Sequence, residues 1–132
     1  VKDLDLNNNV MFLGQKNNVQ EWMQAADIVL FPSHIGEGMG RVTYESMATS
    51  TPVIATDIVG VNESVTDEVG TLINQEDPKA MAEAIELLSN DKELYRKLAL
   101  AGRKRALELF DIKTHASRIM ELYIKLVKSN EN

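Results

Sequence analysis

The residues best suited to chemistry lie in one glycine-rich loop and in the helix expected after it. Glu37 opens this stretch and Glu45 closes it, with seven residues between them. Gly38, Met39 and Gly40 supply the backbone of the loop. Glycines let a backbone approach a ligand closely, and free N–H groups at a helix start favour an anion such as phosphate. Carboxylates accept hydrogen bonds from paired hydroxyl groups, so the pattern predicts a nucleotide site whose ligand presents two diols.

Simpler interpretations compete with this one. Glycine loops between a strand and a helix are common without any ligand, and a single glutamate such as Glu45 is often only a solvated helix residue. Arg41, in the first turn of the same helix, can form an exposed ion pair with Glu37 or Glu45, and such pairs are weak. The basic run at residues 103–105 is expected to be a solvated helix patch.

A dinucleotide-binding fingerprint is a second alternative for the loop. Gly36, Gly38 and Gly40 resemble the GxGxxG pattern, and Asp57 follows the next expected strand near the offset of a ribose-binding acid. The spacing disfavours it, because the third glycine of that pattern would fall at Arg41.

Two further groups are weaker candidates. Asp3 and Asp5 form an Asp-x-Asp pair of the kind that holds the metal ion of a diphosphate, but they lie in an expected loose end before any strand. His34 shares the glycine loop and is a candidate to line a cleft, whereas His115 is expected on a helix, in a structural or exposed place. We therefore expect no metal site.

Short apolar runs alternate with helical patterns in the first half of the chain. Strands covered by helices on both faces need such continuous apolar runs, so the pattern predicts an α/β fold with an open parallel, Rossmann-like sheet. Ligands bind such sheets beyond the carboxyl ends of the strands, in loops like those after Gly14, Pro32 and Thr56. The expected strands span residues 10–14, 28–31, 52–56 and 71–74, with helices near 19–26 and 41–49.

Three helices are predicted in the second half. Asp77, Asp91 and Asp111 each stand where an N-cap is expected, and Pro78 suits the first helical position. Apolar residues recur at helical spacing in all three, which predicts that each turns a stripe toward the core. Gly102 weakens the second helix, and residues 129–132 are expected to fray.

Composition bounds the function. The chain has 132 residues, a net charge of −6, two histidines and no cysteine, which fits one domain without disulfides or a zinc ribbon. Its apolar runs are too short to span a bilayer, and an acidic chain without a basic stripe is a poor nucleic-acid binder. We expect a cytoplasmic protein. The chain starts at Val1 without a leader pattern, which favours a fragment or a processed chain.

Several motifs together resemble one family. They are FLG at 12–14, ADIVLFPS at 26–33, EGMGRVTYESMA at 37–48, TPVIATD at 51–57 and GTLIN at 70–74, with Phe110 and Tyr123 near the end. This combination resembles the C-terminal, donor-binding half of retaining GT-B glycosyltransferases of group 1 (glycosyltransferase family 4). The resemblance runs from about Val10 to Val127, and its central motif is Glu-x7-Glu.

The resemblance implies roles for the two glutamates. Glu37 would contact hydroxyls of the transferred sugar and is the candidate catalytic residue, while Glu45 would bind the ribose hydroxyls of the nucleotide. The backbone facing the sugar would be that of Gly38, Met39 and Gly40. Members of the family retain anomeric configuration and need no metal cofactor, so the donor nucleotide-sugar is the only small ligand expected.

Other implied contacts concern the nucleotide. The backbone at Val42 and Thr43 would hold the diphosphate at the helix start, and the loop with Gln15 and Lys16 would lie near the base. The family's usual glycine before the third strand is Ser50 here, and its usual glycine pair after that strand is Val59-Gly60.

The resemblance also implies a longer parent enzyme. Residues 1–132 would form a single partial domain whose partner is an N-terminal, acceptor-binding domain of the same parent, with room for peripheral membrane contact by that parent. The isolated chain would then catalyse no transfer. The alternative is a non-catalytic α/β nucleotide-binding or interaction module. Neither nucleotide, sugar nor acceptor is identified by these residues.

Overall fold

The computed structural model describes residues 1–34 and 38–129 of the chain. Three parallel strands form a sheet in the order β1-β2-β3, namely β1 (Val29–Phe31), β2 (Val53–Thr56) and β3 (Thr71–Ile73). The helices are η1 (Lys2–Leu4), α1 (Val19–Ala25), α2 (Arg41–Ala48), α3 (Val61–Ser64), α4 (Pro78–Asn90), α5 (Lys92–Arg105), η2 (Ala106–Phe110) and α6 (Ile112–Ser129). The predicted parallel α/β class is confirmed.

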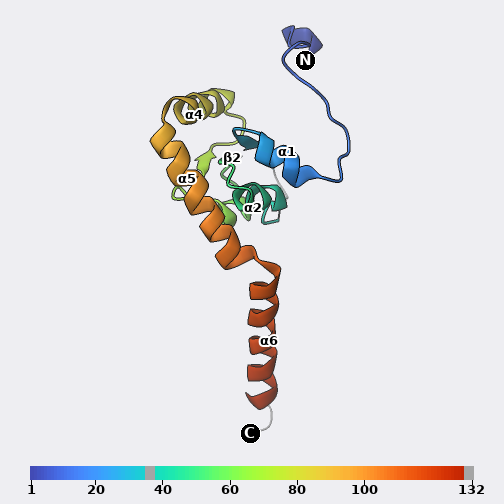
Figure 1. Ribbon diagram of the computed structural model, residues 1–132, viewed down its shortest axis with the longest axis vertical. Helices are drawn as coiled ribbons and strands as arrows, with labels where there is room; N and C mark the ends of the chain where they lie inside the picture. The colour runs from blue at the N-terminus through green and yellow to red at the C-terminus, as the bar shows by residue number, and fades with distance from the viewer. Residues whose placement is uncertain (35–37, 130–132) are drawn as a thin grey trace.

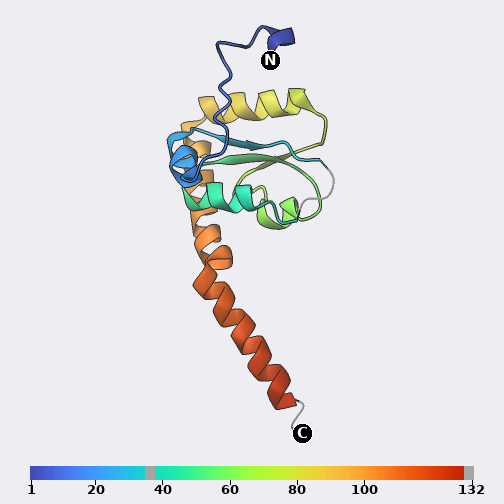
Figure 2. The ribbon, with the colours of Figure 1, turned by 90° about the vertical axis from the view of Figure 1, so that its right-hand side faces the viewer.

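Strand β2 lies at the centre of the sheet, and all four of its residues are buried. Val53 and Ala55 belong to one core cluster together with Met47 of α2. Ile54 belongs to a second cluster together with Leu88 of α4. Figure 2 shows the sheet between α2 on one side and α4 on the other. Because side chains of a strand alternate between faces, one short apolar run fills both layers.

Predicted caps begin two of the C-terminal helices. The Asp77 carboxylate accepts from the Ala80 amide at 2.9 Å, and Pro78 occupies the first turn of α4. The Asp91 carboxylate accepts from the Leu94 amide at 2.8 Å at the start of α5. Local side-chain chemistry fixes where these helices start, as the sequence predicted.

Helix α5 continues through Gly102, which the sequence marked as a weak point. A Cβ at Gly102 would lie 3.1 Å from the Met47 Cγ, so the missing side chain lets α5 approach α2 closely. Close packing there offsets the low helix propensity of glycine.

The predicted strand at residues 10–14 is wrong. This segment forms no strand pair with another part of the described chain, and Phe12 is 83% exposed. Figure 1 shows the chain before α1 leaving the body of the molecule. An apolar run becomes a strand only when a neighbouring strand exchanges hydrogen bonds with it, and the described sheet does not include this run.

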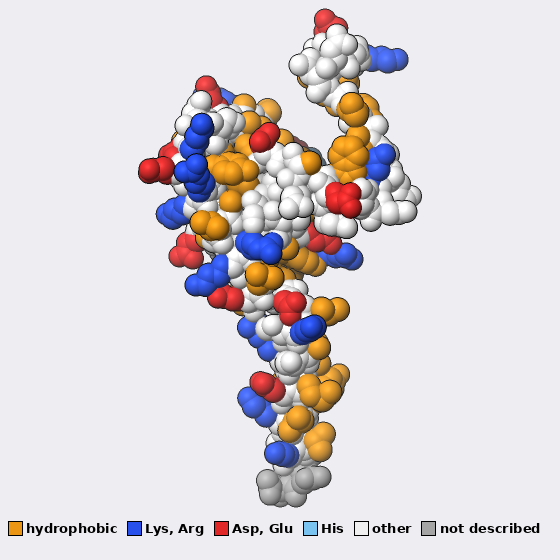
Figure 3. All heavy atoms as spheres, viewed as in Figure 1, with side chains coloured by type: hydrophobic (Ala, Val, Ile, Leu, Met, Phe, Trp, Pro, Cys, Tyr) orange, Lys and Arg blue, Asp and Glu red, His pale blue; other side chains and the backbone are white. Residues whose placement is uncertain are grey.

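The predicted core stripe on α6 is also wrong. The helix has no buried residue, because it projects from the body instead of packing along it (Figures 1 and 2). Hydrophobic side chains gather along one side of it in Figure 3, and Ile112 and Tyr123 are among those exposed. Ser129 is helical, whereas residues 130–132 lie outside the described part. None of the helices described is both long and apolar enough to cross a bilayer.

Gly70 gives a test of the packing before β3. A Cβ there would lie 2.7 Å from the Val65 Cγ1 and 2.9 Å from the Val53 carbonyl oxygen, which is backbone and cannot rotate away. We expect Gly70→Ala to lower the free energy of unfolding by about 1–3 kcal/mol in urea denaturation. Gly38→Ala is the matched control, since a Cβ at Gly38 meets no atom within 4 Å. Equal stability of the two variants would contradict the packing.

Candidate functional site

The predicted anion site is the start of α2, which depends on Gly40. This residue caps the helix in the left-handed region, with φ 60° and ψ 72°. A Cβ on it would lie 3.1 Å from the Phe31 Cε1 and 3.2 Å from the Val61 Cγ2. The backbone angle and the packing therefore both require glycine. The first amides of a helix have no carbonyl one turn earlier to bond, and with the helix dipole they attract an anion.

Two residues predicted to hold a diphosphate occupy the first turn of α2. Val42 is half-buried, whereas Thr43 is fully buried and its amide already donates to the Gly40 carbonyl at 2.8 Å. The amide donors least engaged within the turn are therefore those of Arg41 and Val42, which precede Thr43.

Glu45 lies one turn further along α2, beside Arg41. The Arg41 guanidinium donates to the Glu45 Oε1 at 2.8 Å through one terminal nitrogen and at 3.2 Å through Nε. This hydrogen bond and the charge of Glu45 raise the pKa of Arg41 above its ordinary value. Both bonds end on Oε1, so the lone pairs of Oε2 keep their capacity to accept from hydroxyl groups.

A cavity of about 620 Å³ opens beside Glu45. One wall comes from the start of α2 and the loop before it, and the other comes from η2 and the start of α6. The rings of Tyr44 and Phe110, which are stacked with centroids 4.8 Å apart, form part of its lining. His115 was expected on a helix in a structural or exposed place and not in this cavity, because about 70 residues separate it from Glu45 and no local pattern joins them. The lining residues are Met39, Arg41, Tyr44, Glu45, Leu109, Phe110, Ile112 and His115.

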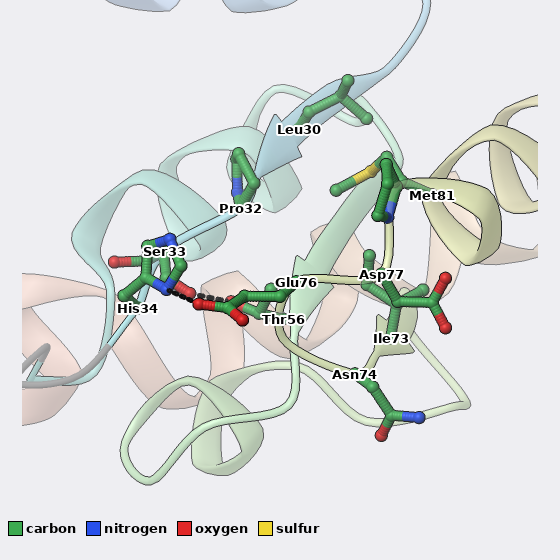
Figure 4. A pocket seen from close by; sticks show the side chains of 11 residues that line it. Leu30, Pro32, Ser33, His34, Thr56, Ile73, Asn74, Glu76, Asp77 and Met81 are labelled. Atoms are coloured by element: carbon green, nitrogen blue, oxygen red, sulfur yellow. Dashed lines mark hydrogen bonds and ion pairs between the residues drawn. The ribbon is translucent and has the colours of Figure 1, made fainter.

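A second cavity, of about 290 Å³, lies beyond the carboxyl ends of the strands (Figure 4). His34 lines it, as the sequence suggested, and its Nδ1 lies 4.0 Å from the Glu76 Oε1 across the opening. The Thr56 hydroxyl donates to the Ser33 carbonyl at 2.6 Å and holds the end of β1 against β2. The remaining walls are formed by apolar side chains, including those of Leu30 and Met81.

The remaining predicted site residues are dispersed. Gln15 and Lys16 lie in the exposed loop before α1, where the Lys16 ammonium stands 5.7 Å from the Trp22 ring centroid. Within the described ranges, no hydrogen bond or ion pair joins this loop to α2. Met39 and Gly38 are exposed in the turn before Gly40. The prediction for Glu37 lies outside the described residues.

The basic run at 103–105 is exposed at Arg103 and Lys104, as expected, but its two arginines also bind carbonyl groups of other helices. Arg103 donates to the carbonyl of Ala48, the last residue of α2. Arg105 donates through Nε to the Ser64 carbonyl at 3.0 Å and through a terminal nitrogen to the Glu63 carbonyl at 2.8 Å. Two arginines of α5 thus bind the carbonyl ends of α2 and α3. Helix spacing alone could not show this, because the partners are more than 40 residues away.

The Asp-x-Asp pair lies far from these features. Asp3 and Asp5 are exposed at η1, at the end of the molecule opposite to α6 in Figure 1. Among the described residues, no group of three potential metal-binding side chains comes together.

A parallel sheet, a glycine-capped helix start and a carboxylate one turn away are typical of nucleotide-binding α/β domains. Comparison with known proteins narrows this class. A family model described as glycosyl transferases group 1 matches residues 1–105. The lipopolysaccharide core biosynthesis mannosyltransferase LpsB of Rhizobium meliloti is 32% identical over 93% of this chain and 36% of its own length. The chain therefore belongs to the group 1 glycosyltransferases.

Solved structures show the same architecture. Sucrose-phosphate synthase from Thermosynechococcus elongatus superimposes with a TM-score of 0.88, at 32% identity, over 98% of this chain and 33% of that one. Anabaena Alr3699/HepE in complex with UDP gives a TM-score of 0.90 at 30% identity over 94% of this chain and 34% of that one. The fold is part of a GT-B fold, and the chain spans about a third of the length of these relatives.

The start of α6, which borders the Glu45 cavity, gives a pH-dependent prediction. The Asp111 carboxylate accepts from the amides of Thr114 at 3.1 Å and Lys113 at 3.0 Å, and these bonds hold its pKa below the ordinary 3.8. A carboxylate whose folded pKa is depressed contributes stability above its unfolded pKa and loses it as the pH falls through the folded one.

We therefore expect the amide shifts of Lys113 and Thr114 to titrate together with a midpoint below 3.8, observed by NMR as the pH is lowered. Asp111→Asn is the control, because asparagine also caps helices but does not titrate in this range. Equal pH dependence of these two amide shifts in the variant and in the unmodified chain would contradict the cap.

Proposed function

We propose that this chain is the donor-binding half of a retaining glycosyltransferase of family 4, which transfers a sugar from a nucleotide-sugar to an acceptor. The observation that supports this most is the pairing of a glycine-capped helix start with Glu45 one turn away. The helix start presents amides to a diphosphate, and the carboxylate accepts hydrogen bonds from ribose hydroxyls. A nucleotide-sugar needs both groups at about this separation.

The relatives support a uridine nucleotide as the first ligand to test. Anabaena Alr3699/HepE has been solved with UDP and with UDP-glucose, and both structures superimpose on 94% of this chain. In our proposal the amides of Arg41 and Val42, with Thr43 in the same turn, hold the diphosphate. Arg41 remains on one oxygen of Glu45 while the ribose takes the other.

The sugar and the base lie on either side of this diphosphate in the proposal. Glu37 binds the hydroxyls of the transferred sugar and is the catalytic residue, next to the backbone of Gly38, Met39 and Gly40. Gln15 and Lys16 contact the base. Retention of configuration and these roles rest on the motif resemblance, in which the Glu-x7-Glu spacing is kept.

The acceptor belongs in this proposal to an N-terminal domain of a longer parent, and the isolated chain transfers no sugar. Two surfaces support the presence of more protein. The outer edge of β1 has no strand partner in the described chain, and the apolar side of α6 is exposed along its length (Figure 3). We place the parent in the cytoplasm, because a chain without cysteine suits a reducing compartment. The proposal allows the parent to contact a membrane surface peripherally.

The division of roles between the two glutamates can be measured in the parent enzyme. Glu45→Ala removes charge-assisted hydrogen bonds to the ribose, so we expect UDP affinity to fall about ten- to hundredfold in calorimetric titration. Glu37→Ala should leave UDP affinity nearly intact and abolish most sugar transfer. Glu86→Ala on the exposed side of α4 is the control for an acidic side chain lost elsewhere. Equal loss of UDP affinity in the Glu37 and Glu45 variants would refute this division.

The proposal includes no metal cofactor. The diphosphate is stabilised by the helix start and by protein cations, while Asp3 and Asp5 lie far from α2. Sugar transfer by the parent should therefore continue in an excess of EDTA, and added magnesium or manganese should not increase it. Activity that disappears in EDTA and returns with either ion would show that carboxylates bind a required cation.

A further inference from the structure

Behind the start of α2 lies a pair of fully buried hydroxyl groups. The Thr43 Oγ1 and the Ser64 Oγ are 2.8 Å apart, and neither residue is exposed to solvent. The Thr43 hydroxyl also lies 2.7 Å from the Gly40 carbonyl oxygen, and the Ser64 hydroxyl lies 2.8 Å from the Val61 carbonyl oxygen. A chain of polar contacts thus runs from α3 to the cap of α2.

The two hydroxyl groups have too few protons to form every contact in this series. Two hydroxyl groups carry two protons, but the geometry offers three hydrogen bonds, so one bond is always absent. The Val61 carbonyl already accepts from the Val65 amide at 2.8 Å, and the Gly40 carbonyl already accepts from the Thr43 amide at 2.8 Å, so neither carbonyl is left unsatisfied when one hydroxyl bond is absent. In one of the two arrangements that keep the bond between the hydroxyls, Ser64 donates to Thr43 and Thr43 donates to Gly40, with every group satisfied.

In that arrangement the hydrogen bond from Thr43 to the Gly40 carbonyl acts on the peptide group at the start of α2, where the proposed ligand binds. The Gly40 carbonyl and the Arg41 amide belong to the same peptide group. A carbonyl that accepts a second hydrogen bond polarises its peptide and strengthens the N–H at the other end as a donor. The Arg41 amide is one of the two amides at the start of α2 that precede the first bonded amide of the turn, so the buried hydroxyls influence it without touching any ligand.

The far end of this chain of contacts is fixed to α5. Arg105 donates to the Ser64 carbonyl at 3.0 Å and to the Glu63 carbonyl at 2.8 Å. These are the last carbonyls of α3, which a short helix leaves without intrahelical partners. A cation at a helix carboxyl end is favourable, so Arg105 holds Ser64 at a fixed distance from Thr43.

We infer that Ser64 is a positioning residue of the donor site, which acts through Thr43 on the Gly40 carbonyl and so on the Arg41 amide, with Arg105 as its anchor. This inference rests on the proposed function for its ligand, a nucleoside diphosphate. The geometry of the hydroxyl pair does not depend on that ligand.

The test uses the 132-residue chain labelled with ¹⁵N and titrated with UDP, followed by NMR. Thr43→Val keeps the volume of the side chain and removes its hydroxyl, and Thr43→Ser returns the hydroxyl as the conservative rescue. Ser64→Ala removes the second hydroxyl. Thr51→Val is the matched control, because Thr51 is only 3% exposed and donates at 2.8 Å to the Met23 carbonyl, away from Gly40. Urea denaturation of each variant reports stability separately.

We expect Thr43→Val to weaken UDP binding about fivefold and Ser64→Ala about two- to threefold, the size of one lost hydrogen bond or less. Thr43→Ser should recover most of that loss. Thr51→Val should lower stability as much as Thr43→Val does, with UDP affinity unchanged. Without UDP, the Arg41 amide proton should move upfield in Thr43→Val and in Ser64→Ala but not in Thr51→Val.

Equal weakening of UDP binding in the Thr51 and Thr43 variants would overturn the inference, because stability alone would then explain it. An unchanged Arg41 amide shift in Thr43→Val would overturn it as well. If the unmodified chain shows no response to UDP at the start of α2, the nucleotide assignment of the proposed function fails. The Arg41 shift then still decides whether the hydroxyl pair positions this peptide.

Discussion

The absence of a side chain at Gly40 is the constraint on which the site depends. The Phe31 ring and a methyl group of Val61 approach the place where a Cβ would stand, and the backbone there is left-handed. Any other residue would have to move β1, α3 or the first turn of α2. The direction of the helix start, and with it the orientation of Glu45, therefore follows from how tightly three elements close around one backbone atom.

Helix α5 connects these elements at long range. Arg103 binds the carbonyl end of α2 and Arg105 binds that of α3, while Gly102 lets the backbone of α5 come close to α2. Arginine presents several donors in a planar fork, so one side chain can satisfy two neighbouring carbonyls. One turn of α5 thus holds the carbonyl ends of both α2 and α3.

The sequence predicted what depends on neighbouring residues. The capping aspartates and the strands at 28–31, 52–56 and 71–74 follow from local chemistry, and each was found within a residue or so of its expected place. The strand at 10–14 was wrong because pairing needs a partner that no local pattern reveals. The apolar side of α6 was assigned to a core that does not reach it. Arg105 reaches its carbonyl partners, and His115 reaches the cavity beside Glu45, through the tertiary fold across more than 40 residues.

The outer edge of β1 has a consequence for the life of the chain in a cell. An unpaired strand edge presents a row of backbone donors and acceptors that another extended segment can join. The exposed run at residues 10–13, which is apolar and carries no charge, is a segment of that kind. Whenever both are uncovered in two copies at once, strand addition between molecules competes with correct assembly. Prompt burial of these surfaces during synthesis is therefore a requirement of protein homeostasis.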